Sequence, residues 1–133
     1  MARWLIKSDP EDYSAANLER DGRTLWTGVR NPTAQRHLRG MVKGDDLLVY
    51  HTGDERAVVA IARVEANPIP DPTDKSGKSV AVEIAFVRWL KAPVALADIK
   101  ADPELADMPL VRIGRLSVMP VSAEEWKKLA PGR

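Results

Sequence analysis

Apolar side chains gather in two runs near the middle of the chain that predict a buried hairpin. Residues 46–52 and 57–64 are mostly apolar. The second run is apolar on both faces, as expected of a strand inside a barrel. Only residues 53–56 separate the runs, so the two strands are predicted to pair in an antiparallel hairpin.

A longer strand follows the hairpin. Residues 79–91 alternate between two sets of side chains with the period of a strand, and Pro93 is expected to end it. Residues 68–78, rich in proline and charge, come before this strand and are expected to form a mobile loop.

The strands predicted near the ends of the chain are shorter. Residues 3–7 form an apolar strand, and residues 25–29 form a brief extended segment. Residues 116–121 are predicted to form a last strand. Pro120 indicates that this strand lies at a sheet edge, because proline has no N–H to donate.

Capping residues mark where the helices begin. Helices are predicted over residues 15–20, from Asn31 to about residue 39, over residues 95–101 and after residue 122. Ser14 and Asn31 are suited to N-caps, and Pro32 to a first turn. Ser122 and Glu125 have the spacing of a capping box.

Together these elements predict an α+β fold in which a mixed, mainly antiparallel sheet carries short flanking helices. A closed or nearly closed small barrel would remove the exposed edges of such a sheet. The length of 133 residues suits one domain spanning 1–133, expected as a monomer.

Charge is nearly balanced, with 20 Lys+Arg against 19 Asp+Glu. A protein that binds nucleic acid through bulk electrostatics alone usually carries a clear basic excess. Nucleic-acid binding would therefore need a basic face or a pocket that recognises a base. No apolar run approaches the length of a membrane span, and residues 4–6 are too few for a signal peptide, so a cytoplasmic protein is expected.

The residue types of common catalytic and metal sites are absent or scattered. The chain has no cysteine, and its two histidines, His37 and His51, stand apart. No serine lies in a Gly-x-Ser-x-Gly sequence, and Gly22, Gly28 and Gly40 do not form a phosphate loop. A non-catalytic protein without metal or cofactor is expected.

Seven sequence motifs stand in a recognisable order. They are WLIKSDP at 4–10, WTGVRN at 26–31, GD at 44–45 leading to VYH at 49–51, AIARV at 60–64 with PDP at 70–72, IKADP at 99–103, DMPLVR at 107–112 and RLSVMPV at 115–121. In this order and spacing the chain resembles the EVE domain family. The resemblance implies a PUA-like fold related to YTH and ASCH domains. It also implies a reader of modified bases, chiefly modified cytosine in DNA, with RNA as the other possible host.

Trp26 is the leading candidate for contact with a base. An indole offers a flat apolar surface on which a base can stack, although a core tryptophan is the simpler interpretation. The other base-pocket candidates are Lys7, Ser8, Gly28, Val29, Asn31, Tyr50, His51, Leu116 and Ser117. Asn31 has the alternative role of N-cap. Tyr50 and His51 are neighbours in a strand, so at most one of them can face a given pocket.

Four arginines are candidates for contact with the nucleic-acid backbone: Arg30, Arg36, Arg39 and Arg115. A solvated helix face explains Arg36 and Arg39 almost as well. Two other functions stay open at this point. One is an ASCH-like amide hydrolase that uses Lys7, Ser8, Tyr50 and His51, and the other is a module that binds a small molecule or a peptide.

Overall fold

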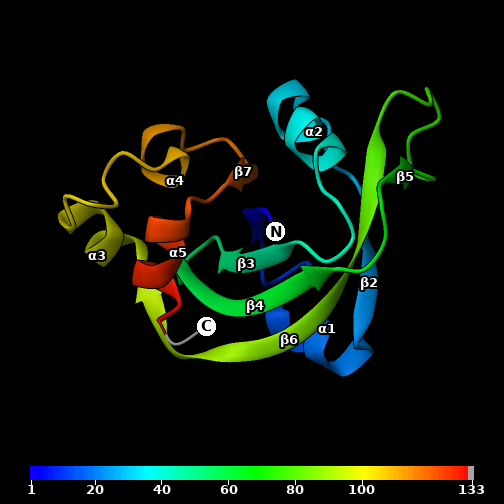
Figure 1. Cartoon of the computed structure of the whole chain (residues 1–133). Helices are drawn as coiled ribbons and strands as arrows, with labels where there is room; N and C mark the ends of the chain where they lie inside the picture. Colours follow the sequence, from blue (N-terminus) through cyan, green and yellow to red (C-terminus); the bar gives the residue numbers. More distant parts are fainter. Residues whose placement is uncertain (132–133) are drawn as a thin grey trace.

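A single curled sheet organises the fold, which a computed structural model describes over residues 1–131 (Figure 1). Its seven strands are β1 (Arg3–Ser8), β2 (Arg23–Trp26), β3 (Asp46–His51), β4 (Ala57–Val64), β5 (Ile69–Pro70), β6 (Val80–Ala95) and β7 (Val118–Pro120). The helices are α1 (Ala15–Asp21), α2 (Pro32–Arg39), α3 (Leu96–Ala101), α4 (Pro109–Arg112) and α5 (Ala123–Leu129).

The strand order is β2-β6-β4-β3-β1-β7, and β5 pairs with β6 beside this path. The pairing of β1 with β3 is parallel, and all other pairings are antiparallel. The predicted α+β fold with a mixed, mainly antiparallel sheet is confirmed. The barrel is half closed, because β2 and β7 end the hydrogen-bonded path at opposite edges.

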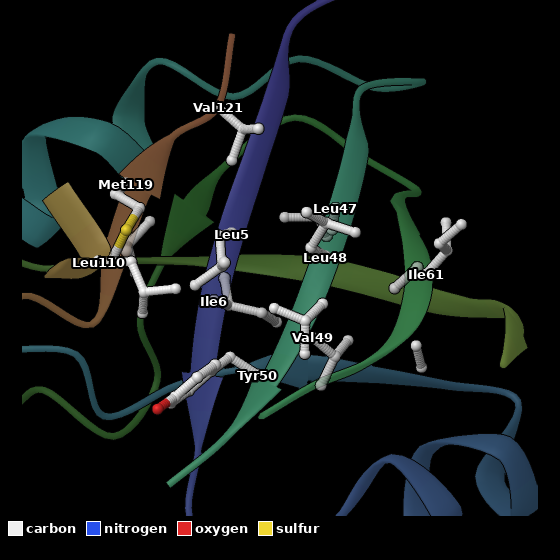
Figure 2. Packing of buried hydrophobic residues seen from close by; sticks show 14 of the residues in the cluster. Leu5, Ile6, Leu47, Leu48, Val49, Tyr50, Ile61, Leu110, Met119 and Val121 are labelled. Atoms are coloured by element: carbon white, nitrogen blue, oxygen red, sulfur yellow. The ribbon is translucent and has the colours of Figure 1, made fainter. Parts of the chain in front are cut away.

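The β3–β4 hairpin forms the centre of the core, as its apolar pattern predicts. Residues 47–51 of β3 are buried, and in β4 only Arg63 is exposed. Figure 2 shows Leu5 and Ile6 of β1 lying beside the side chains of β3 in this cluster. Burial of large side chains such as Leu48, which is fully inaccessible, supplies the main driving force for folding.

Pro93 does not end β6, contrary to the sequence prediction. The strand continues to Ala95, and its pairing with β4 shifts between Ala60↔Trp89 and Val58↔Val94. Several residues of β6 thus lie opposite the single residue Val59. Proline is tolerated there because a bulged residue does not have to donate its N–H to the ladder.

The predicted helix caps are confirmed. The Ser14 side chain accepts a hydrogen bond from the Asn17 N–H, and the Ser122 side chain accepts one from the Glu125 N–H, each within a capping box. Pro120 lies in an edge strand, as expected, since β7 pairs only with β1. The short helix α4 was not predicted; its residues follow a series of tight turns.

The proline-rich segment before β6 contains the two-residue strand β5, which the sequence did not predict. Two aspartates order the residues that follow. Asp71 accepts hydrogen bonds from the backbone and hydroxyl of Thr73, and Asp74 accepts them from the backbone N–H groups of Ser76 and Ser79. Within residues 1–131, no helix combines the length and the apolar character needed to cross a membrane.

Candidate functional site

A pocket of about 500 Å³ opens where the half-barrel fails to close. One wall comes from the end of β1 and the segment after it, with Lys7, Ser8, Asp9, Asp12 and Tyr13, together with Ser117 just before β7. The other wall is residues 24–30, at the end of β2. Since β2 is one edge of the sheet and β1 lies next to the other, the pocket spans the open side of the sheet.

Two aromatic rings meet in this pocket. Trp26, the last residue of β2, is partly buried, and its ring centre lies 6.2 Å from that of Tyr13 with 73° between the ring planes. This edge-to-face arrangement is a favourable one for aromatic pairs. Trp26 therefore packs on the core while also lining the pocket, and is not sealed beneath the sheet.

Tyr13 was not among the sequence candidates. Its hydroxyl donates a 2.8 Å hydrogen bond to Oδ2 of Asp21. Burial, helped by this bond to Asp21, raises the pKa of Tyr13 above its ordinary value, so the phenol stays protonated at neutral pH. The only local signal was an aromatic residue next to the N-cap Ser14, which does not by itself indicate a pocket.

Asp71 anchors the far wall of the pocket from a distant part of the chain. Its side chain is fully inaccessible, and Oδ2 accepts hydrogen bonds from the Gly28 N–H at 2.9 Å and from Nη1 of Arg30 at 3.0 Å. Burial alone would raise the pKa of Asp71, but the bonds from Gly28, Thr73 and Arg30 outweigh it and lower the pKa to about 2. The carboxylate is thus ionised and holds the Gly28 backbone, whose φ of 82° suits glycine.

Gln35 provides a second anchor from helix α2. Its Nε2 donates to the carbonyl oxygen of Val29 at 2.6 Å, and its Oε1 accepts from the Val80 N–H at 2.8 Å. The side chain is 3% exposed, so these bonds form away from bulk water. Gln35 therefore links the pocket wall to the start of β6.

Lys7 and Ser8 close the other side. Nζ of Lys7 donates to the Gly114 carbonyl oxygen at 2.9 Å and lies 5.8 Å from the centre of the Tyr50 ring. Burial lowers the pKa of Lys7 from its ordinary value. The Ser8 hydroxyl donates to the carbonyl oxygen of Tyr13, and the Lys7 N–H donates to the Ser117 carbonyl oxygen at 2.9 Å.

The pocket brings together six of the ten base-pocket candidates: Lys7, Ser8, Trp26, Gly28, Val29 and Ser117. The remaining four, Asn31, Tyr50, His51 and Leu116, lie outside its lining. The Asn31 side chain caps α2 by accepting from the N–H groups of Thr33 and Ala34, and Leu116 is buried in the core.

His51 is engaged on both ring nitrogens. Nε2 accepts from the Ala15 N–H at 3.0 Å, which places the ring proton on Nδ1, 2.7 Å from Oε1 of Glu55. His51 thus supports the first turn of α1. Its neighbour Tyr50 is 3% exposed and stacks beneath Lys7.

Of the four candidate backbone-binding arginines, only Arg30 lines the pocket. Arg36 and Arg39 are exposed on α2, and Nη2 of Arg39 donates to the Lys78 carbonyl oxygen. Arg115 is exposed between α4 and β7.

The pocket groups do not form a recognisable catalytic set. The hydrolase hypothesis needs Lys7, Ser8, Tyr50 and His51 to converge, but only Lys7 and Ser8 line the pocket. Among residues 1–131, no group of three or more His, Asp or Glu side chains could hold a metal ion. The arrangement is suited to binding a flat molecule between an aromatic wall and hydrogen-bonding groups.

The EVE domain family model matches residues 2–131, and the chain belongs to this family. It is 28% identical to human thymocyte nuclear protein 1, over 94% of this chain and 71% of the human protein. The resemblance inferred from the motifs is thereby confirmed.

Solved structures agree closely with this fold. The protein Rpa0253 from Rhodopseudomonas palustris is 45% identical, with a TM-score of 0.93 over 98% of this chain and 91% of that one. Human THYN1 protein, solved in complex with 5-methylcytosine containing DNA, is 27% identical, with a TM-score of 0.91 over 98% and 96% of the two chains. An ASCH protein from Zymomonas mobilis, at 15% identity and a TM-score of 0.59 over 96% and 92%, shares the fold alone.

Proposed function

We propose that this EVE domain is a non-catalytic DNA-binding module that holds one modified cytosine base in the pocket beside Trp26. The observation that carries the proposal is the pocket itself, in which an exposed part of an indole faces hydrogen-bonding groups across the open side of the sheet. The complex of human THYN1 protein with 5-methylcytosine containing DNA supports the choice of ligand.

Trp26 has the main role in this proposal. A base must leave its stack to enter a pocket, which costs a few kcal/mol, and stacking on an aromatic side chain returns about 1–3 kcal/mol. Tyr13 packs against the indole with 73° between the ring planes, so the indole is held in position before the base arrives. Preorganisation of this kind lowers the entropic cost of binding.

The remaining pocket groups match the edges of a modified cytosine. Carboxylates accept hydrogen bonds from the cytosine amino group, and Asp12 is an exposed acceptor in the lining. Leu25 and Val29 offer apolar contacts for a methyl group. The backbone of residues 27–30 is held by Asp71 and Gln35, so these contacts have a defined position.

The charged groups around the pocket would steer the DNA backbone. Lys7 and Arg30 are the cations in its lining, and Arg30 also pairs with Asp71. Arg36, Arg39 and Arg115 stay as predicted contacts to phosphates further along the strand. Because the net charge is only +1, this electrostatic contribution is expected to be modest.

A titration at fixed salt tests the proposal. A duplex with one 5-methylcytosine and its unmodified twin are titrated with the parent protein, Trp26→Ala and Trp89→Ala, with fluorescence anisotropy as the readout. Trp89 is a matched control, since the residue is 40% exposed, its indole N–H donates to Glu19, and it does not line the pocket.

The parent protein and Trp89→Ala are expected to prefer the modified duplex. Trp26→Ala is expected to lose that preference together with about 1–3 kcal/mol of binding free energy. A preference that survives in Trp26→Ala would place the base elsewhere. Chemical change of the modified base during incubation, followed by chromatography, would contradict a non-catalytic role.

A further inference from the structure

A second, smaller hollow adjoins the pocket and differs from it in charge. It encloses about 230 Å³, and its lining includes three cations, Lys7, Arg56 and Lys100, together with Tyr50. No Asp or Glu is among its lining residues within the described part of the chain. We call it the basic hollow. Lys7 lines both the basic hollow and the pocket beside Trp26.

The fold brings the three cations together from separate elements. Lys7 lies near the end of β1, Arg56 lies in the turn of the β3–β4 hairpin, and Lys100 lies on α3. The Leu96 N–H donates to the Arg56 carbonyl oxygen at 2.8 Å, which joins the first residue of α3 to the hairpin turn. Figure 2 shows Tyr50, on which Lys7 stacks, on β3 near the end of β1.

Among the described residues, two cations of the basic hollow, Arg56 and Lys100, have no carboxylate bound to them. Within residues 1–131, no ion pair joins Arg56 or Lys100 to a carboxylate. Arg56 and Lys100 also line an adjoining hollow, together with Asp54 and Glu55, but Glu55 is engaged by His51. Like charges gathered in one place repel each other, so a bound anion would be stabilised there.

The state of the Lys7 amino group also favours binding of an anion. Burial removes part of the hydration of this amino group, which lowers its pKa, while the group donates one hydrogen bond, to the Gly114 carbonyl oxygen. An ammonium group has three protons to donate. A phosphate oxygen could accept one of the others in a charge-assisted hydrogen bond.

We propose that the basic hollow binds a backbone phosphate of the DNA strand whose modified base occupies the pocket beside Trp26. This inference rests on the proposed function and specifies the path of the strand. The strand would pass over Lys7, with the base on one side and the flanking phosphate between Arg56 and Lys100. Neither Arg56 nor Lys100 lines the pocket, so they would contribute affinity without distinguishing the base.

The test compares two double variants that each remove one arginine and one lysine charge. Arg56→Gln/Lys100→Gln removes two cations of the basic hollow. Arg63→Gln/Lys43→Gln is the control, since Arg63 pairs with the first residue of β3 and Lys43 precedes that strand, at the opposite end of the hairpin. Thermal melting establishes that both variants are folded before binding is measured.

Each protein is titrated with the modified duplex and its unmodified twin at several salt concentrations, and with the nucleoside 5-methyl-2′-deoxycytidine, which carries no phosphate. Arg56→Gln/Lys100→Gln is expected to bind both duplexes on the order of tenfold more weakly than the control variant does. The slope of log affinity against log salt is expected to become shallower by about 1. Preference for the modified duplex and affinity for the nucleoside are expected to stay unchanged.

Equal losses in the two double variants, or an unchanged salt slope, would overturn the basic hollow as a phosphate site. A drop in nucleoside affinity would also overturn it, because the hollow would then be acting on the base. Failure of the proposed function is distinguishable from these results. If the parent protein shows no preference for the modified duplex, the slope measured on unmodified DNA still tests the phosphate contact.

Discussion

The β3–β4 hairpin and the segment 26–30 are stabilised in different ways. In the hairpin, backbone groups pair within the sheet ladder and nearly all side chains are buried. Beyond Trp26 the chain leaves the ladder, and the polar groups of Gly28 and Val29 pair with the side chains of Asp71 and Gln35. The pocket thus forms where side-chain hydrogen bonds replace sheet pairing.

This difference separates folding from binding. Apolar burial in the hairpin is a major contribution to the global free energy of unfolding, because this contribution scales with the area removed from water. The wall of the pocket buries less apolar surface and depends on a few directed bonds from a buried carboxylate and a buried amide. Substitutions in the hairpin should therefore lower stability more than DNA affinity, and substitutions in the pocket wall should lower DNA affinity more than stability.

Leu48→Ala should give the largest loss of stability. Leu48 is fully buried in β3, and removing its side chain leaves a cavity that costs about 2–5 kcal/mol in the free energy of unfolding. Urea unfolding measures this loss. The affinity of the folded fraction for modified DNA should stay close to that of the parent protein, and a large change in affinity would mean that the two regions are coupled.

Asp71→Asn should lower the affinity for modified DNA more than it lowers stability. The amide keeps one acceptor oxygen but turns its N–H₂ group toward a donor, so about 1–3 kcal/mol of stability is lost. Affinity for modified DNA should fall further than stability does, because the wall at Gly28 and Arg30 loosens.

Asp74→Asn is the matched control for Asp71→Asn. Asp74 accepts similar bonds in the same loop, from Ser76 and Ser79, but does not contact the pocket wall. Its effect on affinity, measured in the same anisotropy titration, should be small. Equal effects of the two substitutions would show that the loop as a whole, and not the Asp71 carboxylate, supports the site.

Lowering the pH should gradually remove the stability that the ionised Asp71 carboxylate contributes. The folded-state pKa of Asp71 is about 2, below the ordinary value of 3.8, so its ionised form stabilises the folded state. That contribution is complete above about pH 4 and is lost as the pH falls through about 2. The difference in urea stability between parent protein and Asp71→Asn should therefore shrink over this range. A constant difference would mean that the charge on Asp71 does not contribute.

The parts of the fold that could be predicted are those that depend on residues close together in sequence. Ser14, Asn31 and Ser122 cap helices within three residues of themselves, and the hairpin follows from two apolar runs beside a short turn. The prediction that Pro93 ends its strand was wrong. The bulge that accommodates this proline depends on the partner strand β4, which the neighbours of Pro93 in the sequence do not reveal.

The pocket was predictable only in part, for a similar reason. Trp26 could be selected by residue type, and Lys7 by its position at the end of a predicted strand. Asp71 lies 43 residues from Gly28, the wall residue whose N–H it binds. Gln35 lies close in sequence to Val29 of the wall, but its second partner, Val80, is 45 residues away. Histidine is often a functional residue, but the ring of His51 accepts a hydrogen bond from Ala15 at the start of α1 and so has a structural role.

The most direct measurement of the central claim is the NMR signal of the Trp26 indole N–H during titration with modified DNA. The chain has four tryptophans, so the indole region is sparse, and Trp26→Phe assigns the signal. Trp4, whose indole donates to Asp45 at 3.0 Å, and the buried Trp126 serve as internal references. The Trp26 signal should move most with 5-methylcytosine DNA and much less with the unmodified twin. Binding that leaves the Trp26 signal unmoved while other signals shift would contradict a base held beside Trp26.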